Sequence, residues 1–521
     1  MTLTRPRIVV RAVLAALIGA LLSLTGAAAR DVRLVLVGMP PDWIPHLQPI
    51  LDTLSGPDES WIGVAGDDSD VTIRSLDEGP GDFAVIMLAA VVASDAPLID
   101  IRHETLIALM RDGRSPNLPG WTAAVSREAR DLPGLEAAAA LTADHADALA
   151  AALANRQTIG VVRWQTPGWP ANLRPLRIDG LYPAEVAWYG TVESGADAAP
   201  LADRLREALQ DWGAPPVEIA AVGDIMLGRS LAAAVAHTGD PGFPTRLVAS
   251  MPTRADLAIG NLECVLSERG TPAQKRYTFR ATPSAVEALT LAGFDVLSLA
   301  NNHAMDYGGE ALLDTIATLG AAGIAHVGAG ADSDAAHAPA FVTRGGLRFA
   351  FLGYVDVPND SSSSFRTIDT VAGPGLPGVA WADPARIAAD VASARAEADA
   401  VIVLLHSGYE YQETPNAIQR AAARAAIDAG AAAVIGAHPH VLQGVEHHRG
   451  GLIAYSLGNF VFDMTVTQSA LLRLWIAADG VRAHAWEPVI IAAVGQPRPA
   501  PPATAAEIHN TLNRLTRALN R

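Results

Sequence analysis

The chain has only one cysteine, Cys264, among its 521 residues. An intrachain disulfide is therefore excluded, and so is a zinc ribbon built on pairs of cysteines. The sequence also contains no Walker phosphate loop and no internal repeat, which argues against a P-loop NTPase and a repeat solenoid. Any catalytic or binding site must therefore be built from other side chains.

Positive charge is scarce as well. The chain has 38 Lys and Arg against 55 Asp and Glu, which gives a formal net charge of −17. Residues 1–29 contain Arg5, Arg7 and Arg11 and no acidic residue, so their removal would change the charge to −17 − 3 = −20. This balance argues against nucleic acid as a partner and against binding to anionic membrane surfaces. An anionic polymer would have to be bound locally, by a metal ion and arginine.

The N-terminus has the pattern of a secretory signal peptide. Three arginines precede an apolar run at 12–26, and the alanines at 27–29 offer a small-residue cleavage site. We therefore expect export to a periplasmic or other extracytoplasmic location. The alternative is an uncleaved N-terminal helix that anchors the protein, because the apolar stretch at 12–29 is just long enough to span a bilayer.

Length and hydropathy predict two domains after residues 1–29. Half of the residues are hydrophobic and the mean hydropathy is +0.21, which is enough for large cores. An Ala-Pro-Pro hinge at 214–216 separates a smaller α/β domain at 31–213 from a second domain at 217–495. We expect a linker and a terminal helix at 496–521, with an apolar helical stripe that docks on the second domain.

The domain at 31–213 alternates strand-like and helix-like segments. Strands are predicted at 31–38, 82–93, 121–126 and 157–164, and a helix is predicted at 135–155. Seven of the ten tryptophans lie in this domain, where they fill a core or form a separate ligand surface. The segment 159–180 resembles periplasmic solute-binding domains, but the role of the domain stays open.

Five apolar runs in the second domain end in polar side chains of the kinds that bind metal ions. The runs occupy residues 216–224, 256–263, 294–303, 401–406 and 431–440. Helix-like stretches lie between them, at 283–293, 308–323 and 416–430. Strands that alternate with helices predict a largely parallel sheet, in which the carboxyl ends of the strands meet at one edge.

The polar side chains at these strand ends form a mixed set of oxygen and nitrogen donors. They are Asp224, Asn261, Glu263, Asn301, Asn302, His303, His406, His438 and His440. A set of this kind at one sheet edge predicts a metal-centred site. Individual members have simpler alternatives: Asn301 and Asn302 could cap the next helix, Glu263 could be a solvated carboxylate, and a single histidine could be structural.

Eight segments of this domain occur in the order and spacing of a known family. They are GDIMLGR (223–229), GNLEC (260–264), YTFRATP (277–283), LAGFDVLSLANNHAMDYG (291–308), GAG (328–330), HSGYEY (406–411), GAHPHVLQGVE (436–446) and YSLGNFVFD (455–463). On these segments, residues 217–465 resemble the CapA/PgsA family of capsule and poly-γ-glutamate synthesis proteins. The resemblance implies a calcineurin-like metallophosphoesterase domain, a layered α/β fold with mixed sheets, that binds one or two divalent ions (Mn, Zn, Fe or Mg).

The resemblance also implies roles for individual residues. Asp224 and His440 would bind one metal ion. The second ion would be bound by Asn302, His406 and His438. His303 would lie outside the metal shell and contact a phosphate or protonate a leaving group, with Asp306 to orient it. Two metal ions would position a hydroxide for in-line attack and neutralise phosphoryl oxygens.

Two positions depart from the phosphoesterase pattern. The histidine of the usual Asp-x-His motif is replaced by Met226, which we expect to pack in the core because a thioether is a poor ligand for hard cations. The usual bridging aspartate is replaced by Asn261, and Glu263 is the candidate to supply the bridging carboxylate instead. We therefore expect the metal position of Asp224 and His440 to bind its ion more weakly than the position of Asn302, His406 and His438.

Substrate contacts are expected from Arg229, Asn261 and Asn301. Arg229 is the strongest basic candidate for an anionic substrate, although it could equally be a surface residue at the start of a helix.

Two functions follow from these residues. One is a metal-dependent hydrolase that acts on an anionic envelope polymer, its precursor or a phosphorylated small molecule. The other is a non-catalytic component that binds or moves such a polymer, in contact with other capsule-synthesis membrane proteins.

Overall fold

The computed structural model describes residues 216–357 and 365–520 and, between residues 30 and 194, the strands and helices named below with a few adjoining turns. By its internal contacts the chain divides into two units, Met1–Met87 with Glu185–Pro215 and Leu88–Ala184 with Pro216–Arg521. The predicted signal peptide at 1–29 and the hinge residues 214 and 215 lie outside the described residues, and the predicted domain limits stay predictions. Across the part of the chain that the structure describes, no helix is long and apolar enough to cross a membrane.

The segments before residue 195 confirm an α/β pattern with two separate five-stranded sheets. The first has the order β2-β1-β3-β12-β4, from β1 (Arg30–Val37), β2 (Glu59–Gly63), β3 (Val71–Leu76), β4 (Phe83–Val85) and β12 (Trp188–Ser194). The second has the order β10-β5-β9-β7-β8, from β5 (Ala89–Ala93), β7 (Thr122–Ser126), β8 (Leu141–Ala143), β9 (Thr158–Val162) and β10 (Leu173–Pro175). The shorter elements are β6 (Asp100–Ile101), β11 (Arg177–Ile178), α2 (His103–Asp112) and α4 (His145–Ala154).

Two expectations for these segments were wrong in detail. The helix predicted at 135–155 is described only from His145, as α4, and residues 141–143 form strand β8 instead. β8 pairs in parallel with β7, so sheet pairing overrides the helix propensity of an alanine-rich segment there. The single strand predicted at 82–93 is two strands, β4 and β5, in different sheets.

Residues 216–520 contain the two sheets that carry the predicted site. An eight-stranded sheet has the order β18-β17-β14-β13-β28-β29-β30, with β27 beside β13. Its strands are β13 (Val217–Ile225), β14 (Leu257–Leu262), β17 (Val296–Ser298), β18 (Ala325–Val327), β27 (Asn459–Val461), β28 (Gln468–Ala477), β29 (Gly480–Ile491) and β30 (Pro497–Pro499). A six-stranded sheet has the order β20-β21-β23-β24-β26-β25, from β20 (Ala340–Arg344), β21 (Leu347–Asp356), β23 (Ala400–Ser407), β24 (Ala433–Ala437), β25 (Val445–His448) and β26 (Gly451–Ala454).

Side chains cap the first turn of three helices, which begin at Ser333, Pro384 and Ala417. Asp383 accepts a hydrogen bond from Arg386 N at the start of α10, and Asn416 accepts one from Gln419 N at the start of α11. The helices are α6 (Arg229–Thr238), α7 (Val286–Leu291), α8 (Gly308–Ala321), α9 (Ser333–His337), α10 (Pro384–Arg395), α11 (Ala417–Asp428) and α12 (Pro502–Leu519). Short 3-10 turns occupy Pro252–Arg254, Pro283–Ala285 and Thr367–Thr370, and the short strand pairs are β15 (Val265–Leu266) with β16 (Arg280–Ala281) and β19 (Ala329–Gly330) with β22 (Gly378–Val379).

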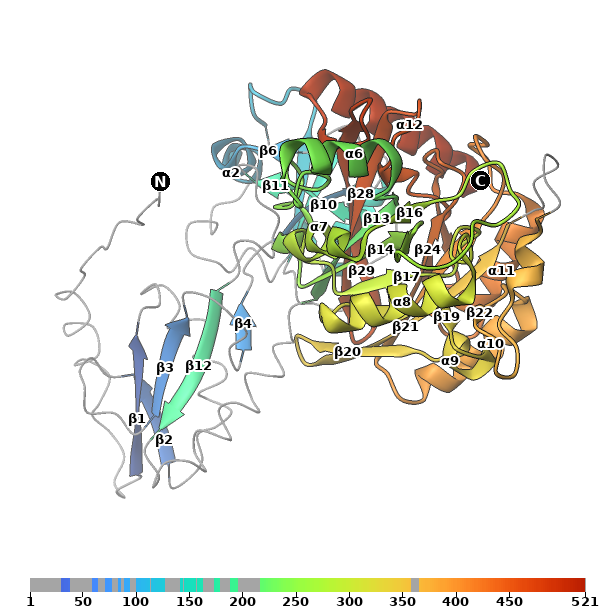
Figure 1. Ribbon diagram of the computed structural model, residues 1–521. Coiled ribbons are helices and arrows are strands. Elements are labelled where there is room, and N and C mark those ends of the chain that lie inside the picture. Colours follow the sequence, from blue (N-terminus) through green and yellow to red (C-terminus); the bar gives the residue numbers. More distant parts are fainter. Residues whose placement is uncertain are drawn as a thin grey trace, which may run out of the picture. The chain divides into compact units, whose positions relative to one another are not determined.

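Three apolar cores define four layers. The middle core joins the inner faces of the two sheets and contains Ile259 and Ile402. A second core packs α7 and α8 against the eight-stranded sheet, with Leu289 and Leu312 buried in it. The third packs α10 and α11 against the six-stranded sheet (Figure 1). The domain is therefore a layered α/β fold of helix, mixed sheet, mixed sheet and helix, as the family resemblance implies.

The C-terminal end of the chain completes this domain. Residues 497–499 form edge strand β30 and α12 begins at Pro502, so the expected linker at 496–504 is instead a strand followed by the first helical turn. The predicted apolar stripe is confirmed, because Ile508 and Leu512 are fully buried in the core between the sheets. Gly444 allows this approach, since a Cβ atom there would lie 2.6 Å from backbone atoms of α12.

Strand register brings the predicted site residues to one edge. In the eight-stranded sheet, Asp224 on β13 pairs with Asn261 on β14, and Asn261 pairs with Ser298 on β17. In the six-stranded sheet, His406 on β23 pairs with Ala437, the last residue of β24 before His438. The carboxyl ends of the central parallel strands of both sheets therefore carry the metal-binding side-chain types.

Candidate metal centre

Seven of the predicted site residues come together as a buried cluster at the strand ends. Asp224 and Glu263 are fully buried, and Asn302 is half-buried. The ring centroids of His406 and His438 are 4.8 Å apart, and those of His438 and His440 are 5.8 Å apart. His303 joins them, because its Nε2 atom lies 3.8 Å from Glu263 Oε1. The polar residues that end five separate strands therefore form one site.

Glu263 is the centre of this cluster and its least satisfied member. Neither carboxylate oxygen has a hydrogen-bond partner among the described residues, although both are fully buried. Oε1 lies 3.8 Å from His406 Nε2 as well as from His303 Nε2. An unpaired buried carboxylate costs free energy, and either protonation or a bound cation offsets that cost.

Two groups of side chains in the described part of the chain could hold a metal ion, and Glu263 belongs to both. One group is Glu263, His438 and His440, and the other is Asp224, Glu263 and His406, with ligand atoms within 4.8 Å of one another in each. This grouping differs from the ligand sets that the family resemblance implies, which put His438 with His406. Because Glu263 belongs to both groups, its carboxylate could serve either one, and these residues fit a divalent ion.

Asp224 is tied to the other members by hydrogen bonds. It accepts from Asn261 Nδ2 at 2.8 Å and from the backbone N of His438 at 3.2 Å. His440 Nδ1 lies 3.3 Å from Asp224 Oδ2 and 2.8 Å from Asn459 Oδ1. His406 Nε2 lies 2.9 Å from Asn302 Oδ1. These partners orient the imidazoles, as hydrogen-bonding neighbours of metal ligands do.

In the absence of a cation, the electrostatics of the cluster favour the neutral forms of Glu263, His406 and His438. Burial raises the pKa of Glu263 well above its ordinary value, and the nearby charge of Asp224 raises it further. Burial lowers the pKa of His406 and of His438 well below the usual range, with a further contribution from neighbouring histidines. For His440, burial acts to lower the pKa but the contacts with Asp224 outweigh it, and the net shift is upward. Neutral imidazole is the form that binds metal ions.

The backbone around the histidine pair is strained. His438 and His440 have φ values of 97° and 57°, in the left-handed region that residues with a side chain rarely adopt. Each such residue costs on the order of 1–3 kcal/mol and persists only where its surroundings hold it. Here the hydrogen bond from His438 N to Asp224 holds His438, and the contact with Asn459 holds His440. The turn between the two imidazoles is therefore fixed before any ligand binds.

The two departures from the phosphoesterase pattern have structural explanations. Met226 is fully buried in the apolar core beside α7 and α8, as we expected, and its sulfur accepts from Gly228 N. Asn261 does not present an oxygen to the cluster, because Asn301 Nδ2 donates to Asn261 Oδ1 at 3.1 Å and leaves Nδ2 facing Asp224 and His406. Asn261 therefore acts as a hydrogen-bonding bridge between strands, and Glu263 is the carboxylate that faces the cluster.

His303 and Asp306 form the pair that the sequence predicts. His303 Nδ1 lies 2.7 Å from Asp306 Oδ2, which also accepts from Phe279 N at 2.5 Å. The Phe279 ring stacks on the His303 ring with centroids 3.9 Å apart. Burial lowers the pKa of His303 to about 4, against the opposing charge of Asp306. Asp306 thus fixes the ring so that Nε2 faces Glu263.

Of the three expected substrate contacts, Arg229 alone is accessible. Its side chain is 40% exposed, lies 3.4 Å from Asp463 Oδ1 and has its guanidinium 5.5 Å from the Phe279 ring. Asn301 is buried and holds the turn, since its Oδ1 accepts from His303 N and its Nδ2 donates to Leu262 O. Arg229 therefore lies at the border of the site, while Asn261 and Asn301 are buried and hold its residues in place by hydrogen bonds.

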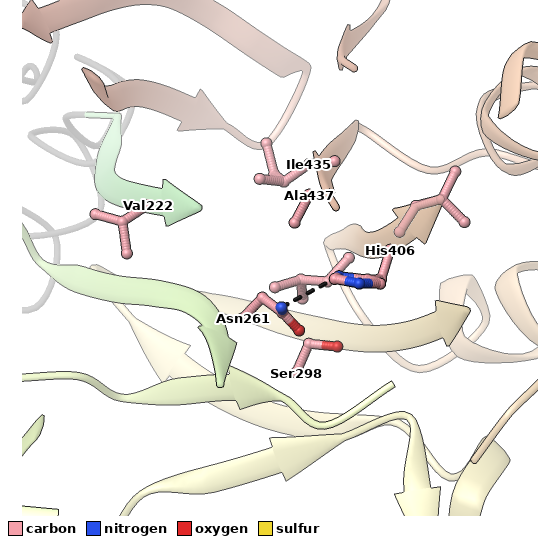
Figure 2. A pocket seen from close by; sticks show the side chains of 9 residues that line it. Val222, Asn261, Ser298, His406, Ile435 and Ala437 are labelled. Atoms are coloured by element: carbon pink, nitrogen blue, oxygen red, sulfur yellow. Dashed lines mark hydrogen bonds between the residues drawn. The ribbon is translucent and has the colours of Figure 1, made fainter. Parts of the chain in front are cut away.

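A small cavity lies between the two sheets beneath the cluster. Figure 2 shows Asn261 and His406 joined by a hydrogen bond on its wall, with Val222 and Ile435 from opposite sheets as apolar lining.

Sequence reasoning missed two residues of the site. Lys275 lies against His303 and Asp306, and Asn459 on β27 orients His440. Asn459 lies in the segment YSLGNFVFD that carries the family resemblance, so its position in a matched motif was a usable signal.

The cluster can be compared with known proteins. A family model described as the bacterial capsule synthesis protein PGA_cap matches residues 218–464. The PGA biosynthesis protein CapA of Bacillus subtilis (strain 168) is 36% identical over 265 residues, which cover 50% of this chain and 67% of that protein. A probable polyglutamine synthesis accessory protein of Mycobacterium tuberculosis (strain CDC 1551 / Oshkosh) is 32% identical over 284 residues, which cover 46% of this chain and 73% of that protein.

Among solved structures, a hypothetical protein from Thermus thermophilus matches 52% of this chain and 99% of its own, with a TM-score of 0.33 and 17% identity. The matched regions cover two thirds or more of these two relatives at over 30% identity. The family model ends where the strand-end motifs end. The chain therefore belongs to the family of the bacterial capsule synthesis protein PGA_cap.

Proposed function

We propose that this protein acts in capsule or poly-γ-glutamate synthesis through a metal-dependent, phosphoesterase-like site at Glu263. The observation that carries the proposal is the fully buried Glu263 carboxylate, which has no hydrogen-bond partner among the described residues and belongs to both groups of metal-binding side chains. The names of the relatives support the biological setting. A signal peptide at 1–29 is part of the proposal and would bring the site to the envelope side of the membrane.

Divalent ions, when bound, would supply an activated hydroxide and stabilise charge on a phosphoryl group. Glu263, Asp224, His406, His438 and His440 would hold them. The proposed ions are Mn, Zn, Fe or Mg, because imidazole ligands suit Zn and Fe while carboxylate ligands suit Mn and Mg.

The chain's own residues would act on the substrate as follows. Asp306 holds His303 through Nδ1, so the lone pair or proton at Nε2 is presented to a group bound beside Glu263. Arg229 supplies positive charge at the border of the site and would orient an anionic group. Burial of the cluster excludes bulk water and strengthens these interactions. The substrate would be an anionic envelope polymer, its precursor or a phosphorylated small molecule.

The proposal is tested by elemental analysis and a screen of phosphate esters, on the purified protein and on Glu263→Gln. Gln keeps the shape of the side chain but cannot bridge two cations, so bound metal and any hydrolysis should fall together. Glu268→Gln is the matched control, since Glu268 is exposed five residues further along the chain. Equal metal content and activity in the unmodified protein and Glu263→Gln would refute the proposal.

A second function is favoured by Met226 and Asn261. With an imidazole and a carboxylate of the phosphoesterase pattern replaced, the site could hold a metal ion that only binds an anionic polymer, without hydrolysis. This component would act beside other capsule-synthesis proteins of the membrane. Metal-dependent retention of poly-γ-glutamate by the protein, with no ester cleaved in the same buffer, would distinguish it from the hydrolase.

A further inference from the structure

Lysine is almost absent from this chain. Of its 38 Lys and Arg residues, 38 − 1 = 37 are arginine, and the single lysine is Lys275. This residue lies in the segment between β15 and β16, outside the strand ends that carry the cluster. The chain therefore uses a guanidinium at every basic position except one, and that one lies beside the candidate metal centre.

The Lys275 ammonium is buried among polar atoms of a single turn. Its side chain is 8% exposed, and its Nζ donates to the backbone carbonyl of Asn302 at 2.8 Å. Nζ also lies 2.6 Å from Asp306 Oδ1, an ion pair whose angle falls outside hydrogen-bond geometry, and 3.3 Å from His303 Nδ1. The Phe365 ring, with its centroid 4.8 Å from Nζ, covers the ammonium.

These contacts suit an ammonium better than a guanidinium. Lysine places a compact charge with three donors on one atom, which can reach a carbonyl and a carboxylate at the same time. Arginine spreads its charge over a planar fork that needs a wider opening and prefers both oxygens of one carboxylate. Here one carboxylate oxygen is already occupied by Phe279 N and His303, so a fork would find only half of its usual partner.

We infer that Lys275 is a positioning residue of the candidate metal centre, whose ammonium fastens the Asn302 carbonyl to Asp306 and so holds Asn302 and His303 toward Glu263. The inference rests on the proposed function in one respect, namely that Asn302 and His303 are the groups that face the metal ions and the substrate.

The Lys275 ammonium thereby positions both His303 and Asn302. Asp306 accepts a hydrogen bond from Phe279 N and forms an ion pair with Lys275, so its carboxylate is ionised. In the contact between Asp306 and His303, the hydrogen is therefore on His303 Nδ1. His303 is then held with Nε2 toward Glu263. The hydrogen bond from Lys275 Nζ to the Asn302 carbonyl holds Asn302 Oδ1 at 2.9 Å from His406 Nε2. Without Lys275, the turn from Asn301 to Asp306 would lose the ammonium that joins the Asn302 carbonyl to the Asp306 carboxylate.

Because Lys275 is the only lysine, an amine-reactive reagent reports on it without interference from other side chains. We expect the native protein to react at its α-amino group alone, and the denatured protein to react at Lys275 as well, as read by mass spectrometry of the peptide that contains residue 275. Asp306→Asn should speed the native reaction of Lys275 about tenfold. Reaction of Lys275 in the native protein as fast as the α-amino group would overturn the placement, whether or not the protein hydrolyses anything.

The second test measures metal affinity by calorimetric titration with MnCl₂ or ZnCl₂. Groups that orient metal ligands typically contribute about 10–100-fold in metal affinity or activity. We expect Lys275→Met and Lys275→Arg both to weaken the tighter metal binding by about tenfold or more. The control is Arg276→Met, which removes an exposed charge from the next position and should change nothing.

Thermal unfolding of each variant ensures that only folded protein is compared. Unchanged affinity in folded Lys275→Met, or full recovery in Lys275→Arg, would overturn the inference, the latter because charge alone would then suffice. Absence of metal binding in the unmodified protein would instead refute the proposed function, and the amine-labelling result would still decide where Lys275 lies.

Discussion

Strand β13 carries a buried acidic residue near each end, and the surroundings of the two residues differ. Near its start, Glu218 forms an ion pair with Arg473 and accepts from Trp475 Nε1 at 3.1 Å. Arg473 also donates to Met251 O at 2.9 Å and to Glu487 Oε2 at 3.1 Å. At the other end of β13, Asp224 neighbours Glu263, whose oxygens have no hydrogen-bond partner among the described residues.

The residues around Arg473 form a structural charge cluster, whereas those around Glu263 form the candidate ligand site. Around Arg473 the protein supplies the counter-charges itself, because the guanidinium forms ion pairs with both Glu218 and Glu487. Around Glu263 carboxylates and imidazoles face one another, with the nearest ammonium, Lys275, already engaged by Asp306. The domain satisfies its buried ions at one end of the sheet and leaves the Glu263 carboxylate without a hydrogen-bond partner among the described residues at the other, where we propose that a cation binds.

The largest effect is expected from breaking the complete cluster. Arg473→Met removes the ion-pair partner of the buried Glu218 and one of the two arginines that pair with Glu487, which keeps Arg254. Removal of one partner from a buried ion pair typically costs about 3–5 kcal/mol. Denaturant unfolding should show this loss, while metal affinity of the folded protein stays unchanged. A weaker metal affinity in the folded variant would show that the two clusters are coupled.

A hundredfold change in rate is expected at His303, because positioned acid–base groups contribute about 10²–10⁴-fold. His303→Ala should lower any hydrolysis by at least about a hundredfold and leave bound metal unchanged, as measured by initial rates and elemental analysis. His303 faces Glu263 but belongs to neither metal-binding group. Loss of metal from this variant would make His303 a ligand and change the assignment of roles.

The smallest effect is expected from restoring an imidazole to the weaker side of the cluster. Met226→His places a polar ring in an apolar core, which should cost the metal-free protein about 1–3 kcal/mol. If the ring reaches the cluster, metal binding at the weaker position becomes tighter and offsets part of that loss. Calorimetric metal titration and thermal unfolding of both forms measure the two effects. A destabilised variant with unchanged metal affinity would show that position 226 faces only the core.

The sequence predicted most of the fold of residues 216–520 because its signals are local. Apolar runs that end at Asp224, His406 and His438 gave the strands, and strand parallelism implied that their ends meet. The strand at 141–143 was missed because alanine-rich segments favour helices until a neighbouring strand pairs with them. Strand β30 was missed because prolines are typical of linkers, although an edge strand tolerates them.

The ligands of the candidate site were predictable, but their partners were not. Lys275 precedes Asn302 and Asp306 by 27 residues or more, and no periodicity relates them, so only the folded chain brings them together. The sequence made Glu263 the candidate carboxylate, but it did not show which way the Asn261 side-chain oxygen points. Hydrogen bonds from Asn301 decide that direction, and sequence spacing cannot report it.

The most direct test of the account is the free energy of unfolding of the unmodified protein and of Glu263→Gln, each measured with a chelator and with excess MnCl₂ or ZnCl₂. With chelator, the two should be about equally stable, because burial favours the neutral form of Glu263 and Gln resembles it. Metal at about 100 times its dissociation constant should stabilise the unmodified protein by about 2.7 kcal/mol. Glu263→Gln should gain much less. If metal stabilises both proteins equally, or neither, Glu263 is not the centre of a metal site and the account is wrong.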